Sequence, residues 1–165
     1  AAPQDSTARM EYAQSLSMAA TGWERKGDLA KAISFAERSV EIRRKLWEAD
    51  SKDHRVRERL AYALVLLGQF RSRQGDSRAA LSYLGDAIAH TEALTRETNF
   101  YMAWHNLAWA SAERAEVYRR IGSGSICVEY RRAADAYRRL LNYRKEYYAK
   151  KLSDVQAKMA GCERN

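Results

Sequence analysis

A segment of nine residues occurs three times along this chain at nearly constant spacing. It reads Gly-Asp-Leu-Ala-Lys-Ala-Ile-Ser-Phe at residues 27–35 and Gly-Asp-Ser-Arg-Ala-Ala-Leu-Ser-Tyr at residues 75–83. A weaker copy, Gly-Ser-Gly-Ser-Ile-Cys-Val-Glu-Tyr, occupies residues 122–130. The copies begin 48 and 47 residues apart, and each has a small residue and then an aromatic residue at matching places. A fixed period of this size predicts stacked helical hairpins rather than one irregular globule.

Composition supports an all-α fold. Pro3 is the only proline among the 165 residues, so nothing beyond it breaks a helix by ring geometry. Hydrophobic residues make up 46% of the chain, which is ordinary for a folded domain and argues against disorder. We therefore predict one all-α domain over residues 1–165.

Glycines and capping residues divide the chain into hairpins. Gly27, Gly75 and Gly122 each suit the left-handed backbone that ends a helix. Asp28 and Asp76 follow two of them and can cap the next helix. Further turns are expected near residues 51–53 and 96, and Ser153 or Asp154 can cap a short terminal helix. The predicted hairpins cover about residues 6–50, 53–95 and 98–144, and the predicted capping helix covers about residues 153–162.

Nine positions carry small residues where two helices of a hairpin would cross closely. This pattern resembles the tetratricopeptide repeat over nearly the whole chain, although the unit is longer than the 34 residues usual for that family. The long unit with Arg-rich second helices looks like the arrays attached to bacterial receptor-type serine/threonine kinases. The resemblance implies a right-handed α-solenoid of three long hairpins plus a capping helix. The small positions are Ala20, Gly68, Ala115, Ala32, Ala80, Cys127, Ser39, Ala87 and Ala134.

The resemblance also implies a function and a site. Members of the family bind proteins or peptides in a concave groove lined by the first helix of each hairpin. We therefore expect a protein–protein interaction or scaffold module, which is the sensory part of a larger signalling protein if the kinase likeness holds. The groove positions in the second and third hairpins are Arg55, Tyr62, Gln69, Arg73, His105, Trp109, Glu116 and Arg120.

Aromatic residues stand out among these positions. Tyr62, His105 and Trp109 would form a patch flanked by arginines, a composition typical of binding hot spots. The alternative is that Trp109 packs in the core beside Trp104, since both cannot face the groove. The clamp with which some family members bind chaperone C-termini is not expected, because it needs Lys and Asn at positions that differ here. Those positions hold Ser17, Thr21, Val65 and Gln69.

The net charge of +8 allows a different class of function. Residues 125–151 hold eight basic residues against three acidic ones, interleaved with tyrosines. We expect them to lie mostly on one helix. Arginine neutralises phosphate and tyrosine stacks on bases, so a basic nucleic-acid-binding protein is the alternative function. The other interpretation of this segment is an amphipathic helix with tyrosines partly buried and arginines in solvent.

The two cysteines lack the spacing of a metal site, and the three histidines are scattered, so we expect no metal and no cofactor. Cys127 is either a buried free thiol or the partner of Cys162. The disulfide stays an alternative because both residues should lie at the same edge of the stack. It would indicate an oxidising compartment and would favour an extracytoplasmic location, which the sequence otherwise leaves undecided.

Catalysis is not expected. The sequence has no phosphate loop and no pairing of a nucleophile with a base, and Glu37, Glu41 and Glu58 lie at solvent-facing spacing. No apolar run is long enough to cross a bilayer. The chain starts without Met, which fits a mature N-terminus after signal cleavage or a boundary within a longer protein.

Overall fold

The computed structural model describes residues 3–123 and 125–162. Within these ranges the chain forms seven helices and no strand, so the predicted all-α class is confirmed. The helices are α1 (Pro3–Arg25), α2 (Leu29–Ala49), α3 (His54–Gln74), α4 (Ser77–Glu97), α5 (Tyr101–Ile121), α6 (Ile126–Arg139) and α7 (Lys145–Cys162).

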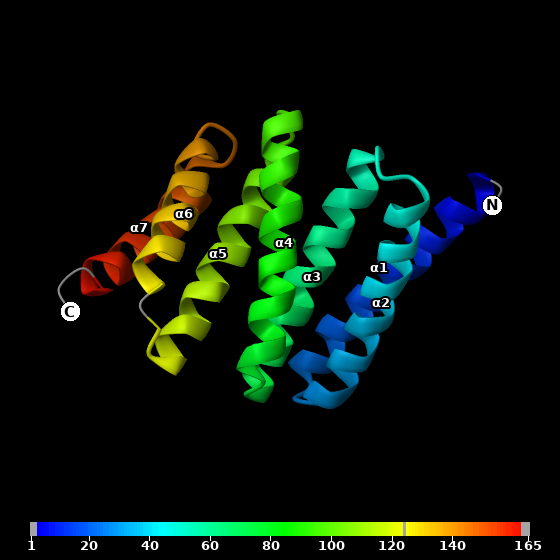
Figure 1. Cartoon of the computed structure of the whole chain (residues 1–165), viewed down its shortest axis with the longest axis horizontal. Coiled ribbons are helices and arrows are strands. Elements are labelled where there is room, and N and C mark those ends of the chain that lie inside the picture. The colour runs from blue at the N-terminus through cyan, green and yellow to red at the C-terminus, as the bar shows by residue number, and fades with distance from the viewer. Residues whose placement is uncertain (1–2, 124, 163–165) are drawn as a thin grey trace.

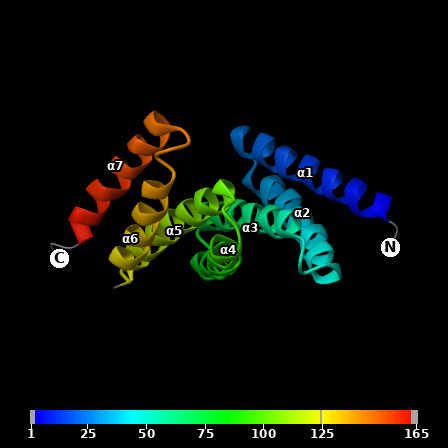
Figure 2. The same ribbon diagram turned by 90° about the horizontal axis from the view of Figure 1, so that it is seen from above.

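The helices form two layers. Helices α2, α4 and α6 lie nearest the viewer in Figure 1, and α1, α3, α5 and α7 lie behind them. Figure 2 shows the inner layer from its end, with α1 and α7 rising on either side of α3 and α5. Each helix packs against the next one in chain order, and α3 also contacts α5. This arrangement is the predicted helical solenoid of hairpins followed by a terminal helix.

The turns within the hairpins follow the predicted stop-and-cap chemistry. Gly27, Gly75 and Gly122 have φ angles of +82°, +93° and +69°, a conformation that glycine adopts without steric cost. The carboxylate of Asp28 accepts a hydrogen bond from the backbone N–H of Lys31 at 3.0 Å. Asp76 caps α4 in the same way. The chain therefore reverses direction where the sequence indicated.

The last part of the chain differs from the prediction. Helix α6 ends at Arg139 rather than Arg144, and the terminal helix begins at Lys145 rather than near Ser153. Residues 145–152 include strong helix formers. Tyr148 and Val155 are both buried, seven residues apart on one face of α7. This burial extends the helix toward its N-terminal end and leaves the expected cap, Ser153, inside it.

Small residues let the two layers approach closely. Ala32 and Ala80 are fully buried, as are Ala20 and Ala115 on the facing helices. A Cβ atom added to Gly68 would lie only 2.7 Å from Leu84 Cγ and 3.0 Å from its Cδ2. Eight of the nine small positions are buried in this way, and Cys127 is the half-buried exception.

We expect Gly68→Ala to destabilise the fold through this contact. Overpacking in a core costs about 1–3 kcal/mol, whereas glycine-to-alanine in an open helix position gains up to about 1 kcal/mol. Gly22→Ala is the matched control, because an added Cβ there has no neighbouring atom within 4 Å. Urea unfolding of both variants measures the difference. Equal gains in stability for the two would show that the layers do not meet at Gly68.

Candidate functional site

Four aromatic side chains form a row across the inner layer. The ring centroids of Tyr62 on α3 and Trp109 on α5 lie 5.8 Å apart. Those of Trp109 and His105 lie 6.5 Å apart, and those of His105 and Tyr148 on α7 lie 5.9 Å apart. We call these four residues the inner-face row. Three of them were predicted site residues. Tyr148, assigned to the Arg/Tyr segment from the sequence, was not recognised as their neighbour.

Hydrogen bonds hold the rings of the inner-face row in place. Glu113 accepts a bond from Gln69 Nε2 at 2.8 Å and one from Trp109 Nε1 at 3.3 Å. The hydroxyl of Tyr148 lies 3.3 Å from His105 Nδ1. Burial and the nearby Lys151 lower the pKa of His105 below its ordinary value of 6.5. The imidazole is therefore neutral at physiological pH.

The structure distinguishes the two tryptophans of α5. Trp104 lies against α6, where the guanidinium carbon of Arg139 is 4.8 Å from its ring centroid. It lines a cleft of about 330 Å³ together with Val128 and other residues of α6. Trp109 instead contacts the row on the inner layer. The two indoles thus take different sides of α5, and Trp109 does not pack beside Trp104.

Two predicted arginines tie neighbouring inner helices together. Arg73 on α3 forms an ion pair with Glu24 on α1. Arg120 on α5 donates to the backbone oxygen of Ser72 at 2.8 Å and also to its hydroxyl. These contacts lie beyond the aromatic row toward the helix ends. Arg55 is not brought to the row. It lines a separate cleft of about 550 Å³ between the start of α1 and the α2–α3 turn.

Glu116, also a predicted site residue, faces the last two helices. Its carboxylate accepts hydrogen bonds from Tyr130 at 2.7 Å and from Lys158 at 2.6 Å, and Arg119 lies 2.9 Å from it. Burial alone would raise its pKa, but these three donors together lower the pKa of Glu116 to about 2. The group lines a pocket of about 760 Å³ between α5, α6 and α7.

The two cysteines lie on the wall of the same pocket. In the structure Cys127 and Cys162 form a disulfide, with Cα atoms 5.8 Å apart, inside the range that a disulfide spans. The bond joins the first turn of α6 to the last turn of α7. Together with the contact between Lys158 and Glu116, it fixes the C-terminal end of α7 to the stack.

A buried polar network was missed from the sequence. Glu58, predicted to face solvent, is only 3% exposed and accepts a hydrogen bond from Asn106 at 3.0 Å. Burial raises its pKa. Arg43 is fully buried, donates to Ser17 and Ser39, and has its pKa lowered to about 10 by burial. The partner of Glu58, Asn106, lies on another hairpin, so no local signal in the sequence could have revealed it.

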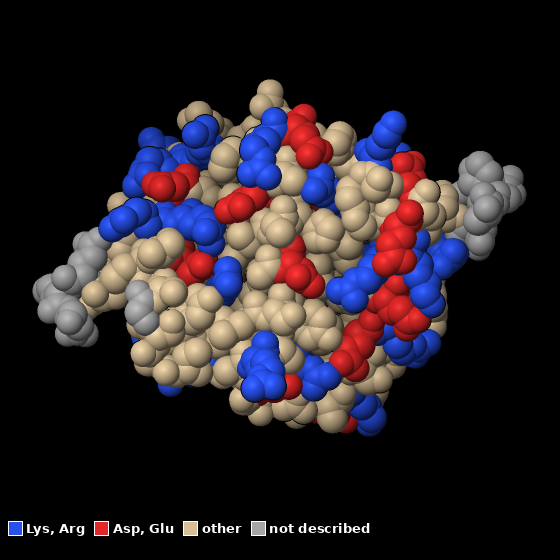
Figure 3. All heavy atoms as spheres, viewed as in Figure 1, with Lys and Arg blue, Asp and Glu red and all other residues tan. Residues whose placement is uncertain are grey.

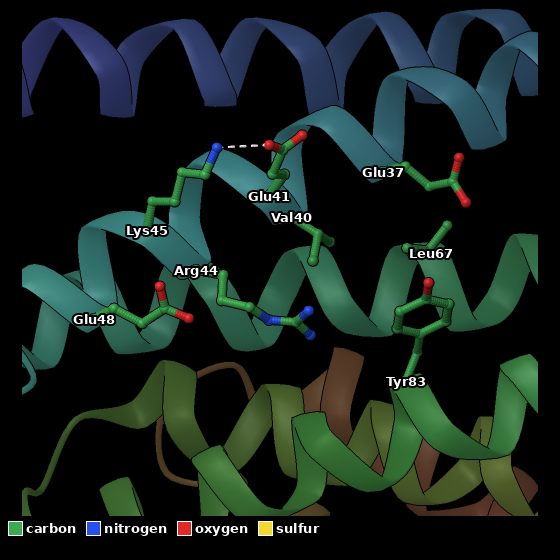
Figure 4. A pocket seen from close by; sticks show the side chains of 8 residues that line it. All are labelled: Glu37, Val40, Glu41, Arg44, Lys45, Glu48, Leu67 and Tyr83. Atoms are coloured by element: carbon green, nitrogen blue, oxygen red, sulfur yellow. Dashed lines mark hydrogen bonds and ion pairs between the residues drawn. The ribbon is translucent and has the colours of Figure 1, made fainter.

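The outer layer offers a smaller cleft of about 270 Å³ between α2 and α4 (Figure 4). Charged side chains surround Val40, Leu67 and Tyr83 there. Two of these charges neutralise each other, in the ion pair of 2.7 Å between Lys45 and Glu41. Others pair with residues just outside the cleft, such as Arg44 with Asp86 at 3.7 Å.

The Arg/Tyr-rich segment 125–151 was predicted to form one helix, and that prediction is wrong. The segment forms α6, a turn and the start of α7. Its tyrosines fall into two groups, because the spacing of seven puts some on the buried stripe. Tyr130 and Tyr137 are buried and Tyr143 and Tyr147 are exposed. Basic side chains gather over the α6–α7 end of the molecule, at the upper left of Figure 3.

Comparison with models of known protein families and with curated proteins found no match. None of the helices that the structure describes combines the length and the apolar character needed to cross a membrane.

We expect Glu116→Gln to destabilise the fold, because a neutral amide loses the charge-assisted bonds to Lys158, Tyr130 and Arg119. Hydrogen bonds to charged groups contribute about 1.5–3 kcal/mol, and the variant should lose that amount at pH 7 in urea unfolding. The contribution of Glu116 is complete above its ordinary pKa of 4.5 and disappears as pH falls toward 2. The stability difference between wild type and variant should shrink over that range.

Glu48→Gln is the control for this prediction, since Glu48 is exposed and has no ion pair in the described chain. It should change stability by less than about 0.5 kcal/mol. A difference between wild type and Glu116→Gln that does not depend on pH would contradict the assignment.

Protein prepared without reductant should contain no alkylatable thiol if the disulfide forms. The bond closes a loop with a sequence separation of 35 residues, and its reduction should lower the free energy of unfolding by roughly 3–4 kcal/mol in the chain-entropy model. Mass spectrometry after alkylation and urea unfolding with and without reductant measure both effects. The Cys127→Ser/Cys162→Ser variant should have the same free energy of unfolding as the reduced protein, and reductant should not change that value. Two alkylated thiols in the unreduced protein would refute the pairing.

Proposed function

We propose that this protein is a binding module of the tetratricopeptide type that holds a protein or peptide partner on its inner layer. The observation that carries the proposal is the inner-face row. Three helices contribute to one line of aromatic contacts, and Tyr62, His105 and Trp109 remain partly exposed. Large aromatic side chains of this kind dominate the energetics of protein interfaces.

Two features support the repeat type. Buried small residues recur at the close crossings of successive hairpins, and partners on adjacent inner helices are one repeat apart in sequence. For example, Arg120 and Ser72 are separated by 48 residues, as are Asn106 and Glu58. A stack of this design presents an extended surface for a partner. We further propose a scaffold or sensory role within a larger signalling protein, following the likeness of its long repeat unit.

We propose that the protein binds its partner without catalysing a reaction. A general acid or base must be able to reach a reacting group with a suitable pKa. The carboxylate of Glu116 is occupied by three donors and has a pKa of about 2. The imidazole of His105 faces Tyr148 within the aromatic row. Both groups stabilise the stack, and neither is presented as a reactive centre.

Photo-crosslinking tests the proposed face. A benzoylphenylalanine placed at Tyr62 or at Gln69 should crosslink the same protein in a lysate of the source cells, because both positions lie on the inner side of α3. The same group at Arg78, an exposed position of the outer helix α4, is the matched control and should not crosslink that protein. Mass spectrometry of the crosslinked bands identifies the partner.

The outcomes separate the alternatives. One protein captured at both inner positions and not at Arg78 supports a binding face on the inner layer. Capture at Arg78 alone would move the site to the outer layer. Absence of any protein at all three positions would contradict the proposed function.

A further inference from the structure

Four exposed aromatic side chains gather at one edge of the stack. They belong to the α4–α5 turn, the start of α5, the α6–α7 turn and the start of α7, which lie at the same edge in Figure 1. They make up half of the exposed large hydrophobic side chains in the part of the chain that the structure describes. We call them the aromatic edge: Phe100 (40% exposed), Tyr101 (39%), Tyr143 (55%) and Tyr147 (42%).

The aromatic edge continues into the inner-face row. Tyr101 stacks on Tyr143 with ring centroids 5.2 Å apart. Tyr147 lies 5.0 Å from Tyr148, measured between ring centroids, and Tyr148 belongs to the inner-face row through His105. The pKa of Tyr148 is raised first by burial and then by the neighbouring Tyr147 and Tyr101. Tyr147 therefore joins the aromatic edge to the inner-face row, and Phe100, Tyr101 and Tyr143 form a separate set of ring contacts at the same edge.

Two cations lie against Tyr147 of the aromatic edge, and no carboxylate in the described chain neutralises them. The guanidinium carbon of Arg144 lies 5.3 Å from the centroid of the Tyr147 ring, and Lys151 Nζ lies 5.9 Å from it. Glu146 is the only acidic residue between positions 139 and 151. Within the described ranges, five basic side chains of this stretch have no ion pair: Arg139, Arg144, Lys145, Lys150 and Lys151.

The way the rings are covered indicates which anionic partner fits. Single-stranded nucleic acid is held by bases that stack on open aromatic faces. Here Tyr101 and Tyr143 stack on each other, and cations lie against the ring of Tyr147. The hydroxyls of Tyr101, Tyr143 and Tyr147 make no hydrogen bond within the described chain and remain available as donors. These hydroxyls can donate to carboxylates, whereas the covered rings leave bases less open face on which to stack.

We propose that the aromatic edge binds an acidic segment of the protein partner. Arg144, Lys151 and the free tyrosine hydroxyls receive its carboxylates, and the adjoining inner-face row receives its apolar side chains. This inference rests on the proposed function and specifies the chemistry of the partner. It concerns the edge of the stack, away from the groove positions where a chaperone-type clamp would lie.

Fluorescence anisotropy with defined probes tests the inference. The first probe is a labelled twelve-residue peptide with repeats of Glu-Phe-Glu-Ser, and its charge-reversed mate replaces Glu by Lys. The third probe is a labelled oligothymidine of similar length. We expect the acidic peptide to bind at least about tenfold more tightly than either of the others at the same salt concentration, and its binding to weaken as salt rises.

Two variants locate the binding. Arg144→Glu/Lys151→Glu should weaken binding of the acidic peptide by at least about tenfold. Lys52→Glu/Arg78→Glu is the matched control, because it makes the same change in net charge at exposed positions without ion pairs in the described chain. It should weaken binding by less than about twofold. Tyr101→Phe/Tyr143→Phe/Tyr147→Phe removes only the hydroxyls and should also weaken binding of the acidic peptide.

The results distinguish the two proposals. Oligothymidine binding more tightly than the acidic peptide would overturn the inference in favour of nucleic acid. Equal effects of the two charge-reversal variants would show that net charge, and not the edge, attracts the peptide. If the crosslinking experiment identifies a partner but the acidic peptide does not bind, the inner-face function stands and the acidic edge is wrong.

Discussion

The close approach of α3 and α4 at Gly68 is the contact on which the arrangement of the inner layer depends. Leu84 and the backbone oxygen of Ala80 lie where a side chain at position 68 would be. Helix α3 also contacts α5 directly, so the depth at which α3 sits against α4 determines how Tyr62 meets Trp109. A larger residue at the crossing would move α3 relative to both neighbours. The aromatic row is thus a consequence of packing between the layers.

The repeat explains why distant residues meet in register. Tyr62 and Trp109 are 47 residues apart, which is one period of the sequence. A spacing of 48 residues, again one period, places Arg120 against Ser72 and Asn106 against the buried Glu58. Each hairpin buries its apolar stripe against the next, so a position that faces one neighbour in the first hairpin does so in all of them. A single pattern therefore generates both the core and a continuous inner surface.

Features that recur in each repeat could be predicted from the sequence. Features found only once, beyond the last repeat or between hairpins, could not. Small residues at helix crossings and the stop-and-cap turns at Gly27 and Gly75 follow from local geometry and recur. The start of α7 has no earlier copy to compare with, so the cap chemistry of Ser153 outweighed the burial of Tyr148 in the prediction. Glu58 was assigned to solvent because its spacing is typical of a charged helix surface. Its partner Asn106 lies on another hairpin, and no local pattern reveals such a pair.

The surface of helix α7 separates residues needed for packing from residues that packing does not explain. It packs mainly against α6 and buries only Tyr148 and Val155, with polar residues over much of its remaining surface, as suits a helix that covers the end of a repeat stack. Polar residues alone would meet that need. Exposed Tyr143 and Tyr147 do not contribute to solubility, and Tyr147 lies beside two cations that no carboxylate in the described chain neutralises. The acidic partner proposed above would supply the missing carboxylates and would cover these apolar rings on binding.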